Sequence, residues 1–142
     1  MSYLENYFNR VPRELRKSSA IAYMAAFDHL KTNNPFIIEK IIQELQDQRC
    51  FFFFFSSENY CSEAVQLAMG NWLTDKYAEG YPYHRFYAGC DNIDAIEATC
   101  VSEAKTIFQC DHAYVQPHSG ADANLVAFWA ILVARIQNKE VE

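Results

Sequence analysis

The sequence has little positive charge. It contains 12 Lys and Arg residues against 18 Asp and Glu residues, which gives a formal net charge of −6. Proteins that bind nucleic acid neutralise phosphates with clustered basic side chains. The basic residues here are mostly scattered, so we expect no nucleic-acid partner.

Long apolar runs are also absent. The longest, from Leu125 to Ala134, is about half of what a bilayer span needs. The first residues, Met1 to Asn6, lack the basic and then apolar segments of a secretory leader. We therefore expect a cytoplasmic location and no membrane contact.

The cysteines lack the paired spacing of a zinc site. Zinc sites normally use two close pairs of Cys or His ligands. Cys110 and His112 form one close pair, but no second pair accompanies them. We predict no metal site, and reduced thiols for all five cysteines: Cys50, Cys61, Cys90, Cys100 and Cys110.

What the chain does contain is enough apolar sequence for one modest core, and its periodicity is mostly helical. The apolar spacing predicts helices over Glu14–Lys31 and Ala121–Gln137 and a further helix after Pro35. Ser62 and Asp91 are each predicted to cap the helix that follows them. The helix after Asp91 has an apolar stripe of Ile93, Ile96, Cys100, Ala104, Ile107 and Phe108. Trp129 on the last helix is expected to be buried.

Two short segments are predicted as strands. Five consecutive phenylalanines, Phe51–Phe55, are consistent with a strand buried on both faces. His112–Val115 is predicted as a strand before a turn, Gln116–Gly120, and the last helix. Helices followed by strand–turn–helix are typical of the beginning of an α/β domain, so the fold class is α/β, with this piece mostly α.

The segment Lys76–Cys90, here called the aromatic loop, holds four of the nine tyrosines together with Glu79, His84 and Arg85. Glu79 lies between tyrosines, and a dry aromatic setting would suit its carboxyl to proton transfer near neutral pH. Tyr77 and Tyr87 could donate hydrogen bonds to an anionic ligand. The alternative is a surface glutamate among packed aromatic rings.

A second candidate site is the turn before the last helix. Free amides at a helix start attract anions, Ser119 adds a hydroxyl, and Gly120 allows close approach of a ligand. The alternative is a simple capping box of Ser119 with Asp122. The Asp122 carboxylate would repel a phosphate bound there. Ser57, Glu58 and Asn59, after the phenylalanine run, are a weaker candidate because such residues also form turns.

Taken in order, these segments resemble the serine hydroxymethyltransferase (glycine hydroxymethyltransferase) family, in its bacterial form. That family has a Ser-Glu-Asn motif, a Lys-Tyr-Ala-Glu-Gly-Tyr-Pro loop ending in Tyr-Gly-Gly-Cys, and a Val-Gln-Pro-His-Ser-Gly turn followed by Gln-Ala-Asn. The corresponding segments here are Ser57–Asn59, Lys76–Pro82 with Arg85–Cys90, and Val115–Asn124. The resemblance covers roughly Phe55 to Ile136.

The resemblance implies a pyridoxal 5'-phosphate (PLP) enzyme with the aspartate-aminotransferase-like, type I fold. Such an enzyme moves a one-carbon unit between serine and tetrahydrofolate and leaves glycine, and it is usually a homodimer or tetramer. By resemblance, Ser119 and Gly120 hold the cofactor phosphate, and Tyr77 reaches the cofactor and substrate across a dimer interface. Glu79 handles the proton of the serine hydroxymethyl group across the same interface. Tyr87 lines the substrate site, and Ser57 contacts the substrate carboxylate.

The chain also departs from the family pattern. Phe86 replaces a tyrosine, Ala88 a glycine and Asp122 a glutamine, and the phenylalanine run replaces an aliphatic strand. The lysine that holds the cofactor is expected beyond Glu142, after a threonine run that is absent here. We therefore interpret residues 1–90 as a helical arm with the active-site loop, and 91–142 as the incomplete start of the PLP-binding large domain.

Two other interpretations stay open. The chain could be a catalytically inactive remnant that acts at most as an interaction or dimerisation module. It could also be a small phosphate-binding domain unrelated to PLP enzymes. We further expect the isolated 142 residues to be poorly soluble, because they would expose strand edges and an apolar helix.

Overall fold

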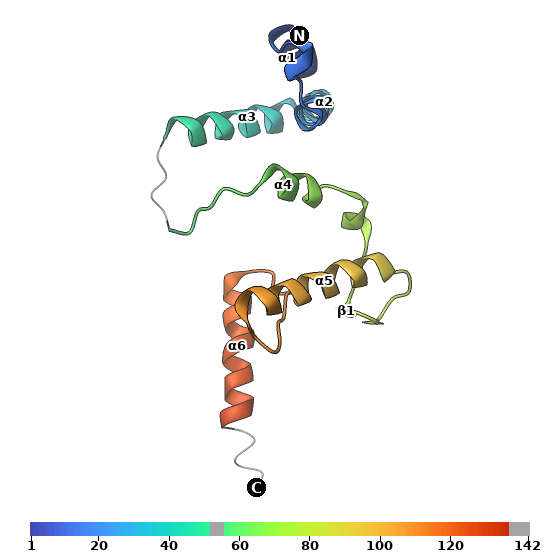
Figure 1. Ribbon diagram of the computed structural model, residues 1–142, viewed down its shortest axis with the longest axis vertical. Helices are drawn as coiled ribbons and strands as arrows, with labels where there is room; N and C mark the ends of the chain where they lie inside the picture. The colour runs from blue at the N-terminus through green and yellow to red at the C-terminus, as the bar shows by residue number, and fades with distance from the viewer. Residues whose placement is uncertain (52–55, 137–142) are drawn as a thin grey trace. The chain divides into compact units, whose positions relative to one another are not determined.

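The computed structural model describes residues 1–51 and 56–136 of the chain. The chain divides into two compact units, Met1–Asn71 and Trp72–Glu142. Figure 1 traces the chain from α1 to α6. Among the described residues, no helix is long and apolar enough to span a membrane.

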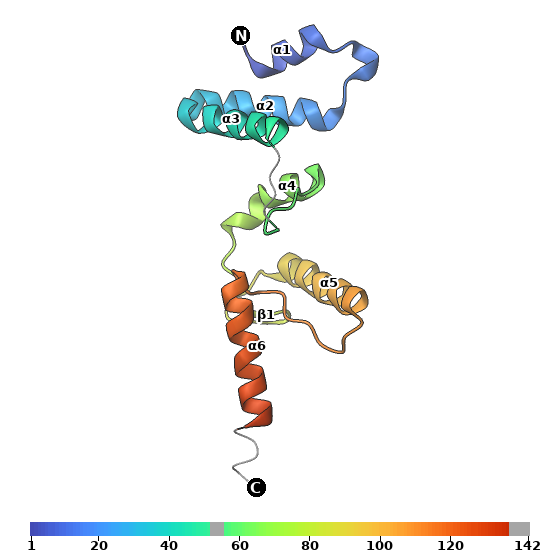
Figure 2. The same ribbon diagram turned by 90° about the vertical axis from the view of Figure 1, so that its left-hand side faces the viewer.

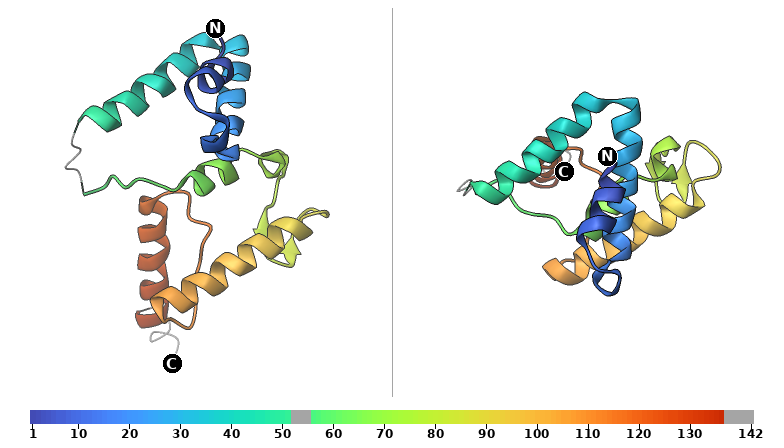
Figure 3. Two further views of the ribbon diagram at one scale, coloured as in Figure 1. Left: turned by 45° about the horizontal axis from the view of Figure 1, so that its top comes forward. Right: turned by 90° about the horizontal axis from the view of Figure 1, so that it is seen from above.

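In its described residues the first unit contains helices and no strand. It contains α1 (Tyr3–Arg10), the 3-10 helix η1 (Arg13–Leu15), α2 (Ser18–Asn33), α3 (Pro35–Cys50) and α4 (Glu63–Met69). α2 contacts both α1 and α3, and Figure 3 shows α2 and α3 meeting at a corner. Ile38 on α3 is the one apolar residue described in this unit as buried, at 2 % exposure.

Local sequence signals account for the starts of these helices. The Asn34 side chain accepts a hydrogen bond from the Ile37 amide at 3.3 Å, and Pro35 fills the first helical position. The Ser62 hydroxyl accepts from the Val65 amide at 3.3 Å and caps α4, which confirms that prediction.

The predicted helix over Glu14–Lys31 is wrong at its beginning. The Lys17 backbone is extended, and its amide donates to the Tyr7 hydroxyl at 3.0 Å instead of to a helix carbonyl. α2 therefore begins only at Ser18.

Asp28 holds the start of α1 against α2. Its carboxylate accepts from the amides of Tyr3, at 2.6 Å, and Leu4, at 3.0 Å. Burial favours the neutral carboxyl, but the hydrogen bonds from Leu4, Tyr3 and Ser2 outweigh it. The pKa of Asp28 is therefore held below its ordinary value of 3.8.

The lowered pKa makes the docking of α1 sensitive to acid. A carboxyl with a lowered pKa stabilises the fold above its unfolded value and loses that effect as the pH falls through the folded value. We therefore expect the amide resonances of Tyr3 and Leu4 to titrate below pH 3.8 in the complete protein. Asp28→Asn should abolish the titration, and a midpoint at or above 3.8 would contradict the account.

The second unit contains η2 (Trp72–Asp75), strands β1 (Gly80–Tyr81) and β2 (His84–Arg85), α5 (Asp91–Phe108) and α6 (Gly120–Arg135). The two strands pair antiparallel, with Gly80 opposite Arg85 and Tyr81 opposite His84. Pro82 and Tyr83 form the turn between them, with Tyr83 at a φ of 65°. Figures 1 and 3 show this hairpin beside the N-terminal end of α5.

The buried side of α5 differs from the predicted apolar stripe. Cys100 is exposed, and Ile96, Ile107 and Phe108 are 56 %, 69 % and 77 % exposed. Asp94 is buried instead, because it holds the basic side chain of the hairpin. Asp91 is the first residue of the helix, and Cys90 occupies the cap position predicted for it.

The predicted strand His112–Val115 is not formed among the described residues. A strand needs a neighbour to accept its backbone hydrogen bonds, and the sheet described here contains only β1 and β2. Of the predicted strand Phe51–Phe55, Phe51 is 64 % exposed and ends α3 as its cap. Residues 52–55 lie outside the described residues.

α6, the lower helix in Figure 2, is apolar from Leu125 to Ala134, and all of its residues except Asp122 are exposed. Trp129 is 66 % exposed, so its predicted burial is wrong within the described residues. An apolar helix of this kind normally packs inside a larger core. The predicted domain boundary at residue 90 and the poor solubility of the isolated chain stay predictions.

Candidate active site

Arg85 organises the aromatic loop. Its side chain is only 4 % exposed, and the guanidinium pairs with two carboxylates of α5. Nε donates to Asp94 Oδ1 at 2.7 Å, and Nη2 donates to Glu97 Oε2 at 2.6 Å. The hydrogen bonds to Glu97 and Asp94 raise the pKa of Arg85 above its ordinary value. The hairpin therefore buries its charged residue and is fixed to the first turns of α5.

The same guanidinium fixes the backbone around Glu79. Arg85 Nη1 donates to the carbonyl oxygens of Ala78 and Gly80, each at 2.9 Å. The Glu79 carbonyl accepts from the Phe86 amide, also at 2.9 Å. The backbone carbonyls of Ala78, Glu79 and Gly80 are therefore all held by hydrogen bonds.

The Glu79 side chain itself is exposed. The dry aromatic setting predicted for it is not built by the described residues, because Glu79 is exposed and the hydrogen bonds around it act on the backbone. The hydrogen bonds therefore fix the backbone of Glu79, and its side chain remains accessible to a ligand or to another protein surface.

Tyr77 and Tyr87 lie together at the two ends of the loop. Their rings meet edge to face with centroids 5.4 Å apart, and Phe86 packs in the same way against Tyr87 at 5.1 Å. Buried Cys90 contacts both ends, since its thiol lies 3.8 Å from the Tyr77 carbonyl and 3.6 Å from the Tyr87 carbonyl. The Tyr77 ring stays 71 % exposed, so its hydroxyl can reach a ligand.

Gln116 joins the aromatic loop to the turn before α6. Its Nε2 donates to the Gly80 carbonyl and to Glu97 Oε1, both at 2.7 Å. The Gly80 carbonyl therefore accepts from both Arg85 and Gln116, and Glu97 binds the same two side chains through its two oxygens.

A cavity of about 560 Å³ opens between these segments. Its walls include Tyr77 and Glu79 from the loop and Tyr114, Gln116 and His118 from the turn. The structure thus brings two of the predicted site residues to the segment that leads into Ser119. Tyr87, Ser119 and Gly120 are not among the wall residues.

Ser119 caps α6 as the sequence predicts. Its hydroxyl oxygen accepts from the Asp122 amide at 3.1 Å, and its carbonyl accepts from the Ala123 amide at 3.0 Å. This is half of the predicted capping box. The geometry of a helix start leaves the Gly120 and Ala121 amides without an acceptor inside the helix. The space beside Gly120 is open, because a Cβ there would have nothing within 4 Å.

The Asp122 carboxylate lies near this helix start. Its Oδ2 is 3.8 Å from His118 Nδ1, and the His118 side chain is 96 % exposed. A carboxylate in the first turn opposes the binding of a second anion there, as the sequence predicts.

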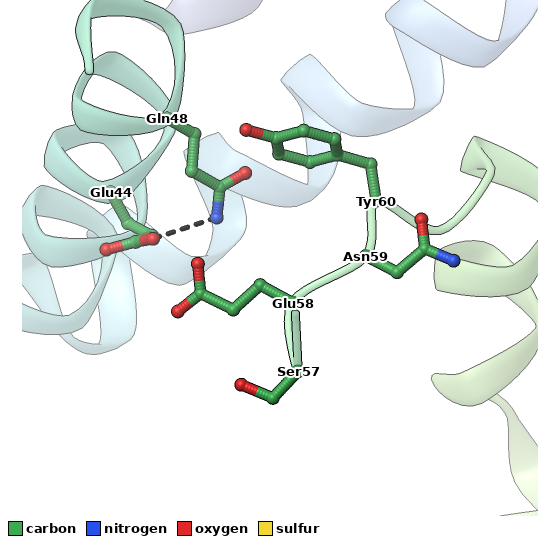
Figure 4. Close-up of a pocket in the computed structure, with 6 residues that line it drawn as sticks. All are labelled: Glu44, Gln48, Ser57, Glu58, Asn59 and Tyr60. Atoms are coloured by element: carbon green, nitrogen blue, oxygen red, sulfur yellow. Dashed lines mark hydrogen bonds between the residues drawn. The ribbon is translucent and has the colours of Figure 1, made fainter. Parts of the chain in front are cut away.

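Ser57 lies in the first unit, in a cavity of about 350 Å³. Figure 4 shows Glu58 and Tyr60 extending toward Gln48 on α3, which donates to Glu44 at 2.8 Å. The six described residues that line it include two carboxylates and neither Lys nor Arg. A substrate carboxylate bound by Ser57 would therefore need a cation from elsewhere.

Sequence reasoning missed the residues that hold the site together: Arg85, Asp94, Glu97 and Gln116. A usable signal was present, because Asp94 and Glu97 are three residues apart on one face of a helix that directly follows the Arg85 segment. No group of three or more His, Cys, Asp or Glu that could hold a metal occurs in the described part of the chain.

Comparisons with known proteins agree with the motifs. A family model described as serine hydroxymethyltransferase matches residues 30–138. A serine hydroxymethyltransferase of Treponema pallidum (strain Nichols) is 55 % identical over 128 residues, which is 90 % of this chain and 22 % of that protein. Serine hydroxymethyltransferases of Chlamydia pneumoniae and Chlamydia abortus are 52 % and 51 % identical over 98 % and 99 % of this chain.

The chain spans about a quarter of the length of these relatives, from 22 % to 28 %. The family match nonetheless covers well over half of the chain and includes the aromatic loop, the Gln116 turn and the start of α6. The chain therefore belongs to the serine hydroxymethyltransferase family, of which it represents an N-terminal piece.

Proposed function

We propose that the complete protein interconverts serine and glycine with tetrahydrofolate as the one-carbon carrier and PLP as cofactor. The observation that carries this proposal is the aromatic loop, in which Arg85 fixes the backbone around Glu79 and Tyr77 stays 71 % exposed, in a member of this family. By family resemblance, the complete protein is a cytoplasmic homodimer or tetramer with the type I PLP fold.

The helix start of α6 fits the phosphate end of PLP. The Ser119 oxygen accepts from Asp122, so its hydrogen remains available to a phosphate oxygen. The amides of Gly120 and Ala121 and the helix dipole favour an anion at the same place. The open space beside Gly120 matches a position that a bound group would fill. When bound, PLP supplies an electron sink for the carbanion chemistry of the amino acid.

The residues of the aromatic loop would act across a subunit interface, in the active site of a partner chain. The Glu79 carboxylate, on a backbone fixed by Arg85, would accept and return the proton of the serine hydroxymethyl group. Tyr77 and Tyr87 would hydrogen-bond the substrate and cofactor across a subunit interface, in line with the exposure of Tyr77. Ser57 would contact the substrate carboxylate together with a cation supplied by another part of the protein.

Gly120→Ala tests the cofactor site. The added methyl has room in the fold, so we expect unchanged unfolding but a loss of PLP affinity of at least about tenfold, because the methyl occupies the proposed phosphate position. The measurement is titration of the cofactor-free complete protein with PLP, followed by absorbance.

Gly70→Ala is the matched control, since a Cβ at Gly70 also has nothing within 4 Å. It should bind PLP as the unsubstituted protein does. Equal affinities for the Gly120 and Gly70 variants would place the phosphate elsewhere and contradict this part of the proposal.

A further inference from the structure

The Arg85 guanidinium joins two parts of the second unit. Nε and Nη2 donate to Asp94 and Glu97 on α5, while Nη1 donates to two backbone carbonyls of the aromatic loop. Four of the five N–H donors of a guanidinium are therefore used. Because the planar group presents its donors in fixed directions, it can hold the loop at a set place on the helix, which a single ammonium group could not do.

The burial of this cluster strengthens its hydrogen bonds. The side chain of Arg85 is 4 % exposed, and those of Asp94 and Glu97 are 9 % and 14 % exposed. Charge-assisted hydrogen bonds are stronger when they are shielded from water. In the part of the chain that the structure describes, no buried side-chain N or O atom lacks a hydrogen-bond partner. The aromatic loop is therefore anchored by residues of its own chain.

Glu79 extends from the backbone that this anchor holds. The Ala78 carbonyl belongs to the peptide plane before Glu79 and accepts from Arg85 at 2.9 Å. The Glu79 carbonyl belongs to the plane after it and accepts from the Phe86 amide at 2.9 Å. Because peptide groups are planar, fixing both planes sets the backbone angles at Glu79 and the direction in which its side chain leaves the backbone. The exposed Glu79 side chain depends on this backbone for its place.

We propose that Arg85 is a positioning residue, which holds Glu79 in the orientation in which the aromatic loop presents it to the partner subunit. The inference rests on the proposed function, in which Arg85 and Glu79 of one chain both serve the active site of the partner. Arg85 acts through the carbonyls of Ala78 and Gly80, and its described hydrogen bonds all go to groups of its own chain.

The test compares Arg85→Lys with the unsubstituted complete protein. Lysine keeps a positive charge beside Asp94 and Glu97 but loses the fork that holds the two carbonyls. We expect kcat for glycine formation from serine to fall about tenfold while KM for serine stays within about twofold, because misplacement of a catalytic group affects the reacting geometry more than ground-state binding.

The same substitution in a Glu79→Gln background separates positioning from a merely structural role. With no proton-transfer group left to misplace, Arg85→Lys should lower kcat less than about twofold there, since two residues that act through one group are not additive. A structural role would lower kcat by the same factor in both backgrounds.

Arg16→Lys is the matched control. Arg16 also holds two backbone carbonyls, since Nε donates to Val11 at 3.0 Å and Nη2 donates to Phe8 at 2.9 Å, but it lies in the first unit. This variant should leave kcat unchanged. If Arg85→Lys does not fold, Asp94→Asn takes its place, because it keeps the size of the side chain and weakens one anchor of the guanidinium. An unchanged kcat for Asp94→Asn would then overturn the inference.

Co-expressed mixtures of subunits test which active site Arg85 serves. Arg85→Lys and Gly120→Ala subunits, assayed at low PLP, form hybrid dimers in which one site combines an unaltered loop with an unaltered cofactor turn. We expect this mixture to be more active than either parent. Arg85→Lys mixed with Glu79→Gln leaves every loop altered and should show no such gain. A gain only in the first mixture supports the inference, and any other pattern overturns it.

The outcomes distinguish this inference from the proposed function. If the unsubstituted complete protein forms glycine, a kcat for Arg85→Lys within twofold of its value, or equal losses in the two Glu79 backgrounds, overturns the role of Arg85 and leaves the proposed function standing. If the unsubstituted protein forms no glycine, the proposed function fails, and the role of Arg85 fails with it.

Discussion

Replacing Glu79 with glutamine in the complete protein should lower kcat for serine cleavage by about 10²- to 10⁴-fold, the usual contribution of a positioned acid or base. Glutamine keeps the shape of the side chain but cannot accept or return a proton. KM for serine should stay within about threefold, because the change removes an interaction needed in the transition state.

The fold should tolerate this substitution. The Glu79 side chain is exposed, and the hydrogen bonds that fix this residue involve backbone carbonyls. Glu103→Gln, at an exposed position of α5 in the same unit, is the matched control and should leave kcat unchanged. A Glu79 variant with kcat within twofold of the unsubstituted protein would remove Glu79 from the reaction.

Gly80→Ala should disrupt the hairpin. Gly80 has a φ of +112°, which side chains rarely adopt, and an added Cβ would overlap the carbonyl oxygen of His84 and approach Arg85 Cα to 3.1 Å. These neighbours are backbone atoms of the paired strand and cannot rotate away. Backbone strain of this kind costs about 1–3 kcal/mol before the overlap is counted, so we expect the Gly80–Arg85 pairing to open.

Hydrogen exchange of residues 77–89 measures the opening of the hairpin. Alanine substitutions at two other glycines give exchange rates for comparison. Gly89 also has a positive φ, +78°, but its Cβ would meet only the mobile end of Lys76, at 3.4 Å. Gly70→Ala meets nothing within 4 Å. Exchange should therefore be fastest for the Gly80 variant, intermediate for Gly89 and unchanged for Gly70. Native-like exchange in Gly80→Ala would mean that the described hairpin is not the stable form.

Local signals in the sequence predicted local structure well. The caps at Ser62 and Ser119 and the proline at the start of α3 each act within one helical turn, so three or four residues contain all the information needed. The motifs of the aromatic loop and the Gln116 turn also identified the family, which the comparisons confirmed.

Longer-range features could not be derived in the same way. The apolar stripe predicted for α5 assumed that an apolar surface packs against the helix. The hairpin instead places the Arg85 guanidinium there, so the side of α5 that packs against it carries Asp94 and Glu97. Whether His112–Val115 forms a strand depends on a neighbouring strand, and the burial of Trp129 depends on a surface that the described residues do not supply. Such features depend on partners that lie elsewhere in a chain or assembly.

The most direct test of the central claim is the formation of glycine from serine by the complete natural protein, with tetrahydrofolate and with PLP either removed or restored. We predict that glycine forms at a rate that depends on both additions. The rate should fall with Gly120→Ala at low PLP and with Glu79→Gln at any PLP concentration. A complete, folded protein that binds PLP and tetrahydrofolate but forms no glycine would contradict the account. It would favour a non-catalytic interaction module instead.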